Sequence, residues 1–130
     1  MAAYPDQIRF VYRDLPVVGG GAVGREAAQA ANCAGDQGQY WEFHNLLLSG
    51  TFGLSRDAYD EYAASLGLDP QALDECLDTG YHEAEVQADL RYALQLGVTS
   101  TPTFFVNGIA IVGAQPAEVF QQVIDRELGG

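Results

Sequence analysis

The dipeptide Asn107-Gly108 constrains the fold of this chain more than any other feature of its sequence. Both residue types accept the positive φ angles of a two-residue turn, and an apolar run lies on either side of the pair. We therefore predict a β-hairpin with strands at residues 103–106 and 109–112. The first run (TFFV) is mainly apolar on both faces, which predicts a buried strand in the centre of a sheet.

Between residues 24 and 96, apolar residues recur at helical spacing, which predicts a series of helices. Ser55 is a candidate N-cap, and Asp69 followed by Pro70 is a second start signal. Gly97 is the expected stop for the last helix of this segment. A final helix is predicted after the hairpin. Its expected inward-facing residues are Phe120, Val123, Ile124 and Leu128.

Residues 8–13 alternate between apolar and charged side chains over most of their length, which predicts a half-buried strand near a sheet edge. A loop with three consecutive glycines follows at residues 19–21. The expected order is therefore strand, helices, β-hairpin and helix, which is typical of an α/β chain with a helical insertion. A length of 130 residues suits one domain.

The composition excludes several classes of function. The net charge is −12 and all six basic residues are arginines, so the surface would repel the phosphates of a nucleic acid. No apolar run approaches the roughly 20 residues that a membrane span needs. The first residues hold neither a basic cluster nor an apolar stretch, so we expect no signal peptide in this chain.

Three motifs resemble those of DsbA-like thiol–disulfide oxidoreductases, which have a thioredoxin fold. Residues 10–16 (FVYRDLP) resemble the strand and loop that follow the active-site helix in that family. Residues 30–34 (AANCA) and 37–44 (QGQYWEFH) look like the start of the family's helical insertion. Residues 97–108 (GVTSTPTFFVNG) closely resemble its cis-proline loop and hairpin. The resemblance implies one thioredoxin-like domain over residues 1–130, with the insertion at about 24–96.

The resemblance also implies a departure from the family. A strand, a Cys-x-x-Cys motif and its helix would precede residue 10, and residues 1–7 are too few to supply them. We therefore expect an incomplete domain with no catalytic residue of its own. In the family the missing strand lies centrally in the sheet, where its absence would leave backbone groups unpaired. The segment at 8–13 could slide into the gap, but we favour a second copy of the chain, as a homodimer.

The resemblance assigns substrate binding to Ser100, Thr101 and Pro102. It implies a cis peptide bond before Pro102 and leaves the backbone of Thr101 free to pair with an extended polypeptide. The alternative is an ordinary trans proline that begins a strand.

The two cysteines, Cys33 and Cys76, are 43 positions apart. An even count, together with a family of oxidising compartments, favours a structural disulfide with Cα atoms within about 7 Å of each other. The alternative is a pair of free, buried thiols. A catalytic role is not expected, because neither cysteine belongs to a Cys-x-x-Cys turn at a helix N-terminus.

His44 and His82 could join the cysteines in a zinc site, but the spacings match no zinc module, and we expect neither a metal nor a cofactor. His44 is instead expected to be packed and hydrogen-bonded on the helix that carries Trp41. Four carboxylates are expected to be solvated. They are Asp14, Asp57, Asp60 and Glu61.

These features favour a DsbA-like module that acts on cysteine-containing polypeptides or redox partners by thiol–disulfide exchange. A non-catalytic peptide-binding or oligomerising module is the alternative, and a product started at the wrong methionine is a third explanation. The resemblance implies an extracytoplasmic or periplasmic location.

Overall fold

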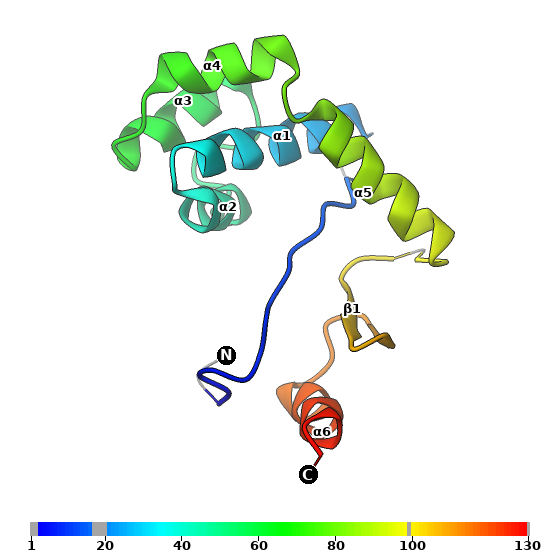
Figure 1. The fold of residues 1–130 in the computed structure, drawn as a ribbon. Helices are drawn as coiled ribbons and strands as arrows, with labels where there is room; N and C mark the ends of the chain where they lie inside the picture. Colours follow the sequence, from blue (N-terminus) through cyan, green and yellow to red (C-terminus); the bar gives the residue numbers. More distant parts are fainter. Residues whose placement is uncertain (1–2, 17–20, 99, 130) are drawn as a thin grey trace. The chain divides into compact units, whose positions relative to one another are not determined.

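The structure is a computed structural model that describes residues 3–16, 21–98 and 100–129. The glycines at 19–20 and Thr99 of the expected loops lie outside these residues. The chain divides into two compact units, Met1–Leu90 and Arg91–Gly130 (Figure 1).

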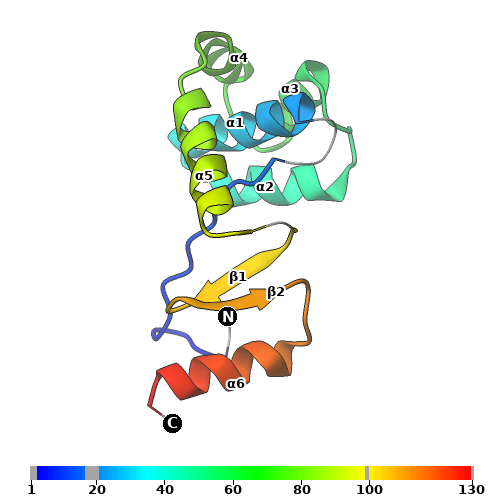
Figure 2. The same ribbon diagram turned by 90° about the vertical axis from the view of Figure 1, so that its right-hand side faces the viewer.

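The first unit is helical. It contains α1 (Ala22–Asp36), α2 (Tyr40–Ser49), α3 (Arg56–Ser65), α4 (Pro70–Thr79) and the larger part of α5 (Glu83–Gln95). Helix α1 contacts α2 and α4, and α3 contacts the same two helices (Figure 2). Alanines on α1 permit this close packing, and the aromatic rings of Phe43, Tyr59 and Tyr62 fill the core between the helices.

Local signals place the helix ends where the sequence predicts them. The Ser55 side chain accepts a hydrogen bond from the Ala58 N–H at 3.1 Å, and Asp69 caps α4 with Pro70 at its first position. Each such cap stabilises a helix by about 1 kcal/mol. Helix α4 ends at Thr79, and the residue that follows it, Gly80, has a left-handed φ of 63°.

The predicted strand at residues 8–13 is wrong. These residues are extended but belong to no sheet, and all except Ile8 are exposed. A strand needs a neighbour to satisfy its backbone groups, and the described part of this helical unit contains none. Alternation of side chains alone therefore did not produce a strand.

The second unit contains the predicted hairpin. Strands β1 (Thr103–Val106) and β2 (Ile109–Val112) pair antiparallel, with Asn107 and Gly108 at φ angles of 49° and 87°. Helix α6 (Ala117–Glu127) packs on β1, where the rings of Phe104 and Phe120 meet edge to face at 4.8 Å.

Two expectations for this unit are wrong. Strand β1 is not buried, since Phe105 is 44% exposed, because the strand pairs only with β2 among the described residues. Leu128 is also exposed rather than inward, because α6 ends at Glu127. The apolar character of both faces predicted the strand correctly but not its burial.

Candidate functional site

The loop that precedes β1 carries the expected substrate-binding residues. Ser100, Thr101 and Pro102 are exposed, and the Thr101–Pro102 peptide bond is cis. The Ser100 carbonyl accepts a hydrogen bond from the Thr103 hydroxyl at 2.8 Å, and the Pro102 carbonyl accepts one from the Gly113 N–H at 2.8 Å. Within the described residues, no hydrogen bond engages the backbone of Thr101.

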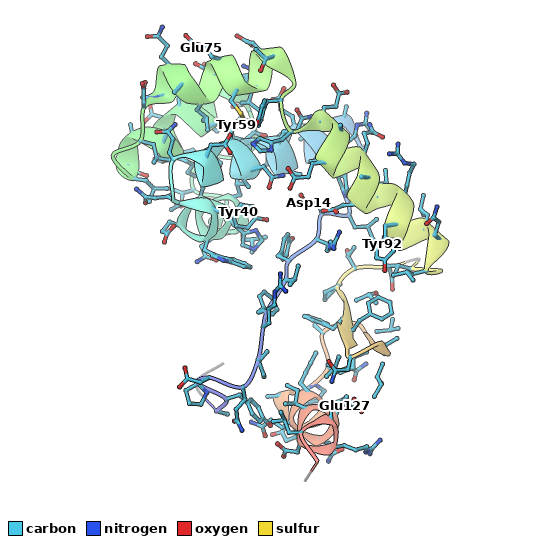
Figure 3. The ribbon with its side chains drawn as sticks, in the orientation of Figure 1. Asp14, Tyr40, Tyr59, Glu75, Tyr92 and Glu127 are labelled. Atoms are coloured by element: carbon cyan, nitrogen blue, oxygen red, sulfur yellow. A yellow bond between two sulfur atoms is a disulfide. The ribbon has the colours of Figure 1, made fainter. Side chains whose placement is uncertain are left out.

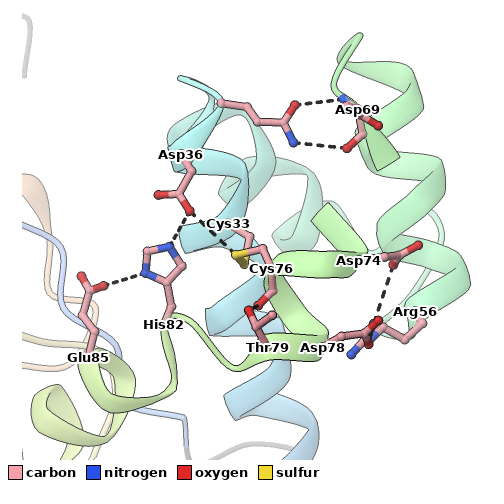
Figure 4. Close-up of a disulfide and its surroundings, with 11 residues drawn as sticks. Cys33, Asp36, Arg56, Asp69, Asp74, Cys76, Asp78, Thr79, His82 and Glu85 are labelled. Carbon is pink, nitrogen blue, oxygen red and sulfur yellow. Dashed lines mark hydrogen bonds and ion pairs between the residues drawn. A yellow bond between two sulfur atoms is a disulfide. The ribbon is translucent and has the colours of Figure 1, made fainter. Parts of the chain in front are cut away.

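The second feature is a disulfide between Cys33 of α1 and Cys76 of α4, as predicted (Figure 4). The Cα atoms are 6.0 Å apart and the S–S distance is 2.07 Å. Cys33 is buried in the helical core, and Cys76 lies at its margin. The bond therefore fixes α4 against α1 and closes a loop across most of the helical unit.

His82 lies beside this disulfide, immediately before α5, and is only 9% exposed. Its Nε2 atom is 2.8 Å from Asp36 Oδ2 at the end of α1, and its Nδ1 atom is 2.8 Å from Glu85 Oε2 (Figure 4). The same Asp36 oxygen is 3.8 Å from the Cys76 sulfur, which as a disulfide atom has no proton to donate. The ring is thus held between two carboxylates.

These carboxylates control the charge of His82. Burial lowers the pKa of His82, but hydrogen bonds and charge attraction from Asp36 and Glu85 outweigh it, so the pKa is raised overall. One signal for this group is present in the sequence, which is the three-residue spacing of His82 and Glu85. The sequence holds none for Asp36, which is 46 positions away from the histidine.

The expected solvation of Asp14 is wrong. Asn32 donates a hydrogen bond to the Asp14 carboxylate at 3.2 Å, and the backbone N–H of Asp14 donates one to Asp89 at 3.1 Å. Asp14 lies where the extended segment meets the helices (Figure 3). Burial, followed by the nearby charges of Asp89 and Glu85, raises the pKa of Asp14 to about 6, although the bond from Asn32 opposes the shift.

The other three carboxylates differ in their exposure to solvent. Asp57 and Glu61 are exposed, as expected. Asp60 is half-buried, and within the described residues its Oδ1 atom has no hydrogen-bond partner, so its expected solvation is wrong. The difference follows from the position of Asp60 near α4, where its charge acts on Asp74.

An aromatic cluster surrounds His44. Its ring lies 4.5 Å from Tyr12, 5.9 Å from Tyr40 and 5.5 Å from Trp41. Phe10 extends the cluster through Trp41, and both rings are about half exposed. In the described part of the chain, the His44 side chain has ring contacts and no hydrogen bond, so its expected hydrogen bond stays a prediction. Burial lowers the pKa of His44.

Comparison with known proteins identifies the chain. A family model described as Thioredoxin matches residues 2–126, nearly the whole sequence. The chain belongs to the thioredoxin family. This result confirms the resemblance predicted from the motifs, and with it the α/β thioredoxin-like fold.

Solved structures agree with the assignment to the thioredoxin family. A thioredoxin-like oxidoreductase from Silicibacter pomeroyi is similar with a TM-score of 0.78 and 29% identity, over 92% of this chain and 68% of that one. The thiol-disulfide exchange protein alpha-DsbA2 from Wolbachia pipientis has a TM-score of 0.77 over 89% of this chain and 63% of its own. At 22% identity, this second likeness supports the fold alone.

The curated relatives are longer proteins. The chain is 33% identical over 129 residues to the Na(+)/H(+) antiporter NhaA of Herminiimonas arsenicoxydans, and 35% identical over 123 residues to NhaA 1 of Salinispora arenicola. These matches span 99% and 95% of this chain but only 20% and 19% of the relatives. Among the described residues, no helix has the length and apolar character that crossing a bilayer requires.

Proposed function

We propose that this chain is a DsbA-like thiol–disulfide oxidoreductase module that binds cysteine-containing polypeptides at the loop Ser100–Pro102. The observation that carries the proposal is that Thr101 is an exposed residue whose N–H and C=O have no hydrogen-bond partner among the described residues. An extended polypeptide can add hydrogen bonds there as a strand adds to a sheet edge. The thioredoxin-like oxidoreductase from Silicibacter pomeroyi supports the class of chemistry.

The exchange itself requires a thiolate that attacks a disulfide sulfur, followed by a second thiolate that resolves the mixed disulfide. The two cysteines of this chain are bonded to each other and stand 43 positions apart, so they form no Cys-x-x-Cys pair. In this proposal the attacking thiolate is therefore supplied from outside residues 1–130, and this chain contributes the binding loop.

Nuclear magnetic resonance tests the binding step. The ¹⁵N-labelled chain is titrated with a blocked peptide in which serine replaces the cysteine, so that no exchange occurs. We expect the amide signals of Ser100, Thr101 and Thr103 to shift. A matched peptide with N-methyl groups on the residues flanking the serine cannot pair as a strand and should not shift them. Equal shifts with both peptides, or none with either, would refute the proposed loop.

A homo-oligomerising module is the second candidate. It is supported by β1, which pairs with β2 alone among the described strands and exposes 44% of Phe105. Multi-angle light scattering on dilute protein should then give a dimer, and Phe105→Lys should shift it to monomer. Leu48→Lys, at a residue of α2 that is 75% exposed, is the matched control and should leave the dimer unchanged. A wild-type monomer would eliminate this candidate.

A further inference from the structure

We propose that reduction of the Cys33–Cys76 disulfide creates a binding site for a divalent cation of the zinc class. The ligands are the two thiolates, His82 Nε2 and Asp36 Oδ2. The proposal goes beyond the function proposed above and does not depend on it. It concerns the helical unit only, in which all four residues lie.

The first support is the convergence of donors from three places in the chain. The two sulfurs and a ring nitrogen of His82 all lie within 4.8 Å of one another, and Asp36 Oδ2 lies 2.8 Å from His82 Nε2. In a tetrahedral zinc site, Zn–S bonds of about 2.3 Å and Zn–N bonds of about 2.0 Å hold the ligand atoms roughly 3–4 Å apart. Once the S–S bond is broken, small side-chain rotations bring these donors to that spacing.

The second support is the partner on the far side of the histidine. Metal-binding histidines commonly donate their other ring N–H to a carboxylate, which fixes the tautomer and the orientation of the ring. Glu85 occupies this position, with its Oε2 atom 2.8 Å from His82 Nδ1 (Figure 4). A proton on Nδ1 then leaves the Nε2 lone pair directed at Asp36 and the sulfurs. This arrangement does not follow from the needs of the disulfide.

The surroundings allow entry and favour a cation. Cys33 is 2% exposed and His82 is 9% exposed, so the inner side of the site excludes solvent. Asp36 is exposed and Cys76 is partly so, which leaves an approach from the surface. The chain carries a net charge of −12, which raises the local concentration of divalent cations.

Reduction of the disulfide and binding of the cation are two separate steps. A small-molecule or protein dithiol supplies two electrons and two protons, gives two cysteine thiols, and is itself oxidised to a disulfide. The cation then binds the two sulfurs as thiolates, and both thiol protons pass to solvent, with a third from Nε2 if the ring is charged. Because oxidation restores the S–S bond and removes both thiolates, the site exists only in the reduced chain.

Cobalt(II) provides the direct test, because it reports coordination by its absorption spectrum. The full chain is reduced with a dithiol under nitrogen, freed of reductant and titrated with Co²⁺. We expect one equivalent to bind, with the intense visible bands of tetrahedral cobalt and a thiolate-to-cobalt charge-transfer band, and Zn²⁺ to displace it. The oxidised chain should show neither band. A reduced chain that binds no cobalt would overturn the proposal.

Substitutions at His82 and at its partner Glu85 distinguish a four-ligand site from binding by the two thiolates alone. Glu85→Gln should weaken cobalt binding about tenfold through the orientation of the ring, and His82→Gln should weaken it at least as much and shift the visible bands. His44→Gln removes the other histidine of the chain and should change neither property. Wild-type affinity and spectrum in His82→Gln would overturn the proposal.

Circular dichroism shows whether the chain stays folded after the disulfide is reduced. If the reduced chain is helical, the cobalt titration needs no further control for folding. If it is partly unfolded, Zn²⁺ should restore the helical signal in wild type and in His44→Gln, and fail to restore it in His82→Gln. Recovery to the same extent in all three proteins would show binding by the thiols alone and overturn the four-ligand site.

Discussion

The Nε2 atom of His82 lies 2.8 Å from the Oδ2 atom of Asp36, which joins the start of α5 to the end of α1 beside the disulfide. A second carboxylate, from Glu85, holds the other side of the ring at the same distance. His82 thus links two elements across 46 positions of the sequence. Its titration should therefore be visible in the stability of the fold.

His82→Gln should destabilise the protein more at pH 6 than at pH 9. The pKa of His82 is raised in the folded state, so its stabilising contribution is complete below the unfolded value and is lost as the pH rises through the folded value. Two partly exposed charge-assisted hydrogen bonds suggest a loss of about 1 kcal/mol at the lower pH. Urea unfolding at both pH values measures the difference.

His44→Gln is the control for that experiment, and the pH dependence of its effect on stability should have the opposite sign. Burial lowers the pKa of His44, so the unfolded chain binds the proton more readily and wild type loses stability as the pH falls. The free energy of unfolding of the variant should therefore rise relative to that of wild type as the pH falls toward 6. An equal pH dependence of the two variants would contradict the assignment of His82 to its carboxylate pair.

Removing the disulfide should lower the free energy of unfolding by about 3–4 kcal/mol. The bond closes a loop of 43 residues between α1 and α4, and its loss gives the unfolded chain more conformations. The double variant Cys33→Ala/Cys76→Ala, compared with oxidised wild type by urea unfolding, measures the effect. A loss below about 1 kcal/mol would show that helix packing alone holds α4 in place.

Asp14→Asn should stabilise the protein at pH 8 and have little effect at pH 4. The pKa of Asp14 is raised to about 6, so the charged form is disfavoured in the folded state and stability is lost as the pH rises from about 4 to 6. Because the group is partly exposed, we expect a gain of about 1 kcal/mol, less than the shift alone implies. Thermal unfolding at both pH values provides the measurement.

Glu61→Gln is the matched control, since Glu61 is an exposed carboxylate on α3. It should change the melting temperature little at either pH. Destabilisation by Asp14→Asn at pH 8 would instead mean that the hydrogen bond from Asn32 to the charged carboxylate outweighs the cost of burial.

The purified chain should not accelerate the reduction of insulin by a dithiol. Its two cysteines form a disulfide in which Cys33 is 2% exposed, and neither lies in the Cys-x-x-Cys turn that lowers the pKa of a reactive thiol. Turbidity of precipitating insulin chains measures the rate against a dithiol blank. A rate above the blank that disappears in Cys33→Ala would show that the insertion cysteines exchange with substrate.

Several elements could be predicted because their causes are local. The Asn107-Gly108 turn requires positive φ angles that these residues accept, and the Ser55 and Asp69 caps satisfy helix ends within three residues. The family resemblance also predicted the cis peptide bond before Pro102, and the even cysteine count together with that family predicted the disulfide. Each of these depends on residues adjacent in the sequence or on a resemblance spread along it.

Other features depend on neighbours that the sequence does not place. Residues 8–13 alternate like a strand, but a strand exists only where another chain segment completes its hydrogen bonds. The burial that raises the pKa of Asp14 comes from contacts with Asn32 and Asp89, and the charge of His82 depends on Asp36, 46 positions away. The sequence by itself thus determined the hairpin, the helix ends and the family. Only the tertiary structure decided which polar groups meet, because desolvation and charge coupling act over a few ångströms in space and not along the chain.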